Sequence, residues 1–119
     1  MKKNILMVLL AIPFVLSSNN IAHAGPCETQ NSTHEMNQCA DLLYKEADKE
    51  LNEVWQALPN RTRNKLRQSQ RDWIKYRDRI CKEKADEIAG EGTMRYMILI
   101  GCKTDETEQR TKYLEEFLF

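Results

Sequence analysis

The sequence has little of what catalytic and nucleotide-binding sites usually need. Glycine occurs four times in 119 residues, and Gly90-Glu91-Gly92 is typical of a turn between helices, not of a phosphate loop. Beyond residue 24 there is one histidine, His34, and no serine lies in a nucleophile motif. The cysteines are separated by 11, 41 and 20 residues, without the close pair typical of zinc sites. We therefore predict that the protein is not an enzyme and holds no metal or cofactor.

The longest apolar run, residues 5–16, is well below the ~20 residues that a membrane span needs. Two lysines precede the run, and Ala22-His23-Ala24 offers small residues at the positions that a signal peptidase reads. We expect a cleaved signal peptide, residues 1–24, with an uncleaved anchor helix as the weaker alternative. One domain, residues 25–119, would remain.

The expected domain is periplasmic or secreted and has no stable membrane anchor, because Pro26 stands where a lipobox needs a small residue. It contains all four cysteines, and an even number in a small exported chain favours two disulfides, each worth about 2–4 kcal/mol. They are Cys27, Cys39, Cys81 and Cys102. Helix register leaves all three pairings open, with a slight preference for Cys39–Cys81 and Cys27–Cys102.

Apolar residues recur at steps of three and four along three segments, which predicts an all-α fold. We expect a small, disulfide-stapled, three-helix antiparallel bundle. Ser32 and Glu35 fit a capping box at the start of the first helix. Gly101 lies inside the third helix, so a kink or break near this residue stays open. The expected helices are 32–58, 60–89 and 93 to the end, with turns at residue 59 and at 90–92.

Charge is segregated along the domain, which has 16 basic and 18 acidic residues. Residues 25–59 carry a net charge of −5, residues 60–84 of +7, and residues 85–119 of −4. We prefer the interpretation that neighbouring helices attract one another. A two-faced surface for a charged partner is the alternative.

Two strings of residues stand out together. The first holds Cys27, Gln30, Glu35-Met36-Asn37-Gln38-Cys39-Ala40, Tyr44, Ala47-Asp48, Leu51-Asn52 and Trp55, and the second is Gln70 to Cys81. Cys102, Thr107, Arg110 and Leu114 follow. This combination resembles the LprI-like lysozyme-inhibitor domain family. The resemblance implies a small exported helical domain of bacteria, here without the lipobox of the mycobacterial lipoprotein to which lysozyme inhibition is attached. The resemblance gives no residue-level inhibitory motif that could be assigned to positions of this sequence.

The shared residues also have a structural interpretation. Trp73 is a large apolar anchor, and Arg77 can lay its stem along the core toward Asp41 across the hairpin. Polar side chains within the stripes would form a seam that fixes helix register. The candidates are Asp48, Asn52, Gln70, Arg71 and Arg77. We prefer this interpretation to a ligand-binding cluster.

The main hypothesis is a protein that inhibits lysozyme or another cell-wall hydrolase by occluding its sugar groove. Animal-type lysozymes are strongly basic, so an acidic face would steer the encounter. Its candidate residues are Glu46, Glu50, Glu53, Asp105, Glu106 and Glu108. The alternative is a periplasmic interaction, envelope-stress or toxin-immunity module with an unknown protein partner; a small enzyme is a weaker third option. Export argues against a nucleic-acid partner, and we expect a monomer or weak dimer.

Overall fold

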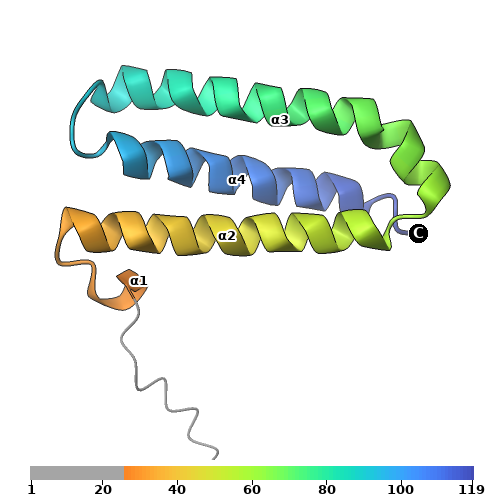
Figure 1. The fold of residues 1–119 in the computed structure, drawn as a ribbon, viewed down its shortest axis with the longest axis horizontal. Coiled ribbons are helices and arrows are strands. Elements are labelled where there is room, and N and C mark those ends of the chain that lie inside the picture. The colour runs from red at the N-terminus through yellow and green to blue at the C-terminus, as the bar shows by residue number, and fades with distance from the viewer. Residues whose placement is uncertain (1–25) are drawn as a thin grey trace, which may run out of the picture.

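The computed structural model describes residues 26–119, and within them every regular element is an α-helix (Figure 1). The predicted all-α fold is therefore confirmed. The predicted signal peptide, residues 1–24, lies outside the described residues. The helices are α1 (Pro26–Thr29), α2 (Thr33–Ala57), α3 (Asn60–Ala89) and α4 (Arg95–Glu115).

The three long helices lie side by side, with α4 between α2 and α3 (Figure 1). α4 runs parallel to α2 and antiparallel to α3, and it contacts both along their length. The hairpin predicted at Pro59 is present, but its two helices make few direct contacts because α4 occupies the space between them. Each long interface of the bundle therefore involves α4.

The helix ends follow local signals in the sequence. The Ser32 hydroxyl caps α2 by accepting a hydrogen bond from the Glu35 N–H at 3.1 Å. The Glu35 carboxylate does not complete the capping box; it accepts from the Thr29 hydroxyl at 2.6 Å, which ties α1 to the start of α2. α3 has the predicted bounds, with Pro59 before it and Gly90 after it.

Two glycines shape the turn between α3 and α4. Gly90 has φ +53°, a conformation that residues with a Cβ rarely adopt. A Cβ on Gly92 would lie 2.9 Å from the Ala89 carbonyl oxygen, so the turn has no room for a side chain there. The turn ends with the Arg95 N–H bonded to the Gly92 carbonyl at 3.1 Å, and α4 begins at Arg95, two residues later than predicted.

The core has different compositions at its two ends. Large apolar residues fill the end near the carboxyl termini of α2 and α4, where Leu58 and Leu114 are 2% and 0% exposed. Toward the amino terminus of α2, the buried residues include Ala40 and Ala47, whose small side chains leave room for α4 to approach. α4 is continuous through Gly101, which settles the possibility of a break there. No helix in the described range has the length and apolarity that a membrane crossing requires.

The predicted pair of disulfides is confirmed, but the preferred pairing is wrong. Cys27 bonds to Cys39, joining α1 to α2, and Cys81 bonds to Cys102, joining α3 to α4. The preference for Cys39–Cys81 assumed that α2 and α3 face one another. Because α4 lies between them, the cysteine of each outer helix takes a different partner.

Several apolar residues of the recurring three- and four-residue pattern lie at the surface. Leu43, Ile74 and Ile88 are 51%, 40% and 60% exposed. Each outer helix packs mainly against α4, so only a narrow stripe of each is covered, and residues at the edge of the apolar face stay outside it. Arg77, in contrast, is a charged residue in the middle of the buried stripe of α3.

Candidate functional site

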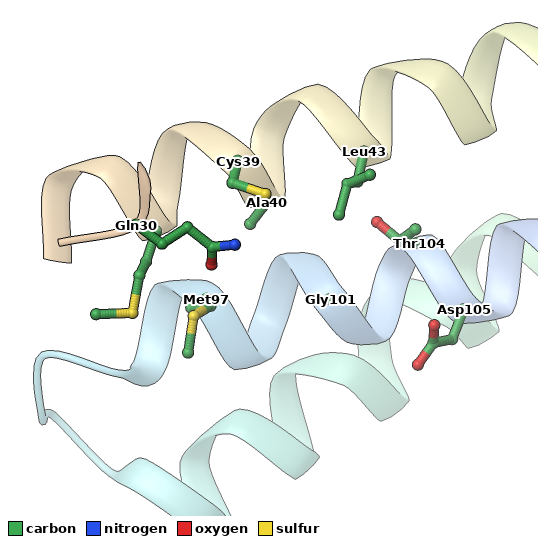
Figure 2. A pocket seen from close by; sticks show the side chains of 9 residues that line it. Gln30, Cys39, Ala40, Leu43, Met97, Gly101, Thr104 and Asp105 are labelled. Atoms are coloured by element: carbon green, nitrogen blue, oxygen red, sulfur yellow. The ribbon is translucent and has the colours of Figure 1, made fainter. Parts of the chain in front are cut away.

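A shallow groove of about 230 Å³ follows the seam between α2 and α4, and we call it the α2–α4 groove (Figure 2). In Figure 2, Leu43 of α2 and Thr104 of α4 point toward one another across it. The lining residues are Gln30, Met36, Cys39, Ala40, Leu43, Met97, Gly101, Thr104 and Asp105.

The sequence explains why a groove forms at this seam. Ala40 and Gly101 have no side chain beyond Cβ, and a Cβ built on Gly101 would meet nothing within 4 Å. Met36 and Met97 form walls that can change shape, because methionine has an unbranched, flexible side chain. The groove therefore combines an apolar lining with walls that can adapt to a partner.

Acidic residues continue the same side of α2 beyond the groove. Glu46 and Glu50 follow Leu43 at steps of three and four, so helix geometry places them toward the side of α2 that borders the groove, and Glu53 lies at the outer edge of that side. All three are exposed, and Glu53 lies 3.9 Å from Lys49 in a weak surface ion pair.

The acidic candidates on α4 divide between two sides of that helix. Asp105 lines the groove, and exposed Glu108 is one turn further along. Glu106 is half-buried and lies one turn from Cys102 and Arg110, which both contact α3. The predicted acidic face thus contains five residues that share the groove side, while Glu106 lies toward α3. We call these five the acidic rim: Glu46, Glu50, Glu53, Asp105 and Glu108.

A second groove, lined by residues of α2 and α3, gathers four of the five predicted seam residues. Asp48 and Asn52 of α2 line it together with Gln70 and Arg77 of α3, beside Trp55 and Trp73. The Asn52 amide donates to the Asp48 carboxylate at 3.4 Å. The fifth candidate, Arg71, is exposed and does not line this groove.

Arg77 is the centre of this polar seam and is 7% exposed. Its guanidinium donates to the Asp78 carboxylate at 3.0 Å and to the Thr107 hydroxyl of α4 at 3.4 Å. It also stacks 5.2 Å from the centre of the Trp73 ring and 5.6 Å from that of Tyr44. Burial is the main reason why the pKa of Tyr44 lies above its ordinary value.

The predicted approach of Arg77 to Asp41 is wrong. The Asp41 carboxylate accepts a hydrogen bond from the Tyr96 hydroxyl of α4 at 2.5 Å. This bond is the main cause of the raised pKa of Tyr96, because it stabilises the protonated phenol. The position of α4 between the outer helices gives Asp41 a partner on α4, while Arg77 finds its carboxylate on the adjacent residue.

Arg110 is a second arginine of the seam; it is half-buried, and no role was predicted for it. Its guanidinium donates to the Gln70 side-chain oxygen at 2.8 Å and to the Ser69 hydroxyl at 3.2 Å. It stacks on Trp73 and Tyr113, at 5.7 and 4.6 Å from the ring centres. Burial lowers its pKa from the ordinary value. The one sign of its importance in the sequence was that Arg110 is among the residues that resemble the family.

The two grooves differ in what they leave free to bind. The seam arginines donate hydrogen bonds to side chains of the same molecule. Their hydrogen-bonding capacity is therefore used largely in holding α3 against α4. The α2–α4 groove and the acidic rim carry open apolar and anionic surface. Among the described residues, no group of three or more histidine, cysteine or carboxylate side chains has the geometry to hold a metal ion.

Comparison with known proteins gives one family. The family model described as lysozyme inhibitor LprI matches residues 25–114. An uncharacterized protein of Rhizobium meliloti (strain 1021), R02472, is 30% identical over 109 residues, covering 77% of this chain and 78% of that protein. No solved structure matches the chain.

Proposed function

This chain belongs to the lysozyme inhibitor LprI family, and from that premise we propose that it inhibits lysozyme-type cell-wall hydrolases by covering their sugar-binding groove. The observation that carries the proposal is the α2–α4 groove, an apolar channel bordered by the acidic rim. The inhibitor acts as a binding protein, and no catalytic step is assigned to it.

The composition of this surface suits a basic enzyme. Stable interfaces combine a desolvated apolar centre with a polar margin. Leu43, which is 51% exposed, together with Met36 and Met97, provides the apolar centre. The acidic rim raises the rate of encounter with a cationic protein and fixes the orientation of the complex.

Export is part of the proposal. A lysozyme inhibitor has to meet its target outside the cytoplasm, and the predicted signal peptide, residues 1–24, would deliver it to the periplasm or the medium. The two disulfides support this location, because such bonds persist in oxidising compartments.

The experiment is a cell-wall clearing assay with a c-type lysozyme and the oxidised protein. The protein is obtained by expressing the full chain and collecting the exported form. We expect inhibition with a near-stoichiometric endpoint that weakens as salt is added. The double variant Glu46→Lys, Glu50→Lys should inhibit about 10-fold less well, because it replaces attraction at the rim with repulsion.

The matched control is Glu87→Lys, Glu91→Lys. It makes the same change in net charge at exposed residues near the end of α3 and in the turn that follows. We expect it to inhibit like the unmodified protein. An absence of inhibition by micromolar unmodified protein would contradict the proposed function. Equal losses in the two double variants would contradict the assignment of the acidic rim.

A further inference from the structure

The amino-terminal half of α3 carries exposed basic side chains without acidic partners. No acidic residue occurs between Asn60 and Arg71, and among the described residues none of these basic side chains forms an ion pair. The set is Arg61, Lys65, Arg67, Arg71 and Lys75, all of which are exposed.

The other half of the same helix is built differently. Arg79 pairs with Glu83 at 3.4 Å, and Lys82 pairs with Asp86 at 2.9 Å, both at the four-residue spacing that stabilises helices. In the amino-terminal half that spacing brings like charges together, as in Arg61 with Lys65 and Arg71 with Lys75. Neutralisation within the helix is thus confined to its second half.

The unpaired charges also stand at the unfavourable end of α3. A helix amino terminus carries partial positive charge and is stabilised by acidic residues, yet the first turn of α3 has none and lacks a side-chain cap. The amino-terminal half of α3 therefore keeps basic residues that work against its own stability. An external negative charge would offset both the repulsion between neighbouring basic residues and their unfavourable position at the helix amino terminus.

Four of these residues lie on one side of α3, and we call them the basic strip: Arg61, Lys65, Arg71 and Lys75. At 100° per residue they share the side of α3 that faces away from buried Arg77 and Cys81. The strip is about 21 Å long at 1.5 Å per residue. One acid, Asp72, lies within it, and its carboxylate accepts a hydrogen bond from Gln68 at 3.0 Å.

We propose that the basic strip docks the protein on the surface of an anionic phospholipid bilayer. Arginine and lysine bind phosphate through charge-assisted hydrogen bonds, and several of them on one side of a helix can meet several headgroups of a layer at once. Gln68, between the strip residues, is polar, so the strip lacks the apolar centre that a protein partner would need. The acidic rim lies on α2 and α4, so docking through α3 leaves that rim free.

The test is sedimentation of the oxidised, exported protein with vesicles of phosphatidylglycerol and phosphatidylcholine, compared with vesicles of phosphatidylcholine alone. We expect binding only to the anionic vesicles, with affinity that falls as salt is added. The double variant Arg71→Gln, Lys75→Gln should bind about 30-fold more weakly, given the contribution of each basic residue at an anionic surface. Circular dichroism would establish that it is folded.

The matched control is Arg79→Gln, Lys82→Gln, which removes two positive charges from the ion-paired half of the same helix. We expect it to retain most of the vesicle binding. Failure to bind anionic vesicles at low salt would overturn the proposal, as would equal losses in the two double variants. Binding to soluble polyphosphate without binding to vesicles would also overturn it, because the ligand would then be a free polyanion.

Discussion

α4 is held by its two neighbours in different ways. Toward α2 it packs small and aliphatic side chains, and its Thr104 and Thr111 hydroxyls donate to carbonyls of α4 itself, at 3.1 and 2.9 Å. Toward α3 it uses directed bonds: the Cys81–Cys102 disulfide and hydrogen bonds from the two seam arginines. The first interface depends mainly on close packing, to which the hydrogen bond from Tyr96 to Asp41 is added, whereas the second depends on a disulfide and several specific partners.

This difference suggests a division of labour between the outer helices. Directed bonds fix the position of α3 along α4, because each needs one partner at one height. Packing of small side chains holds α2, and Asp41 is the charged residue of α2 that bonds to α4, through Tyr96; the acidic rim is left for a partner. If the α3 interface is the more specific of the two, changes to its bonds should cost more stability than changes on the α2 side.

The largest expected effect comes from the disulfide inside the bundle. Cys81→Ala with Cys102→Ala should lower the free energy of unfolding by about 3 kcal/mol, because the bond closes the loop through the turn between α3 and α4. Cys27→Ala with Cys39→Ala should cost less, since that bond secures only the four-residue α1. Urea denaturation measures both. A larger loss from the second pair would contradict the comparison.

A smaller loss is expected from the seam. Arg77→Ala should lower the free energy of unfolding by about 2–3 kcal/mol, because it removes charge-assisted hydrogen bonds and the packing of a buried stem. The control, Arg79→Ala, removes an exposed arginine two residues away and should change stability by about 0.5 kcal/mol or less. Thermal unfolding followed by circular dichroism would compare them, and equal melting temperatures would argue against a stabilising seam.

The smallest effect has the opposite sign and tests the α2 side. Gly101→Ala should raise the free energy of unfolding by about 0.5–1 kcal/mol, because alanine favours a helix interior and its Cβ would meet nothing within 4 Å. Gly90→Ala should lower it, because φ is +53° there. Chemical denaturation of both variants checks the pair. Destabilisation by Gly101→Ala would mean that the groove floor is more tightly packed than described.

Local signals in the sequence were sufficient to predict the three long helices, whereas the four-residue α1 was not predicted. Ser32, Pro59 and Gly90 mark helix ends by capping, by loss of an N–H and by backbone freedom, and each acts within a few residues. The neighbour of each helix was not predictable in this way. Periodicity identifies the apolar side of a helix but not the helix that covers it, so the insertion of α4 and the disulfide pairing were missed.

The candidate site, like the fold, could be predicted only in part from the sequence. A charged residue within an apolar stripe indicated that Arg77 needs partners, but its carboxylate proved to be the adjacent Asp78 instead of Asp41. The acidic positions could be found from composition, yet only the fold separates Glu106 from the rim. The groove itself arises because Ala40 of α2 and Gly101 of α4 line the same seam, a coincidence that no local pattern encodes.

The most direct test of the account is calorimetric titration of a c-type lysozyme with three forms of the oxidised protein at low and moderate salt. The forms are the unmodified protein, Glu46→Lys with Glu50→Lys, and Arg71→Gln with Lys75→Gln. The account predicts a salt-sensitive complex that is weakened about 10-fold by the acidic-rim variant and is not weakened by the basic-strip variant. A complex that survives the first change and is lost with the second would place the lysozyme on α3 and contradict the account.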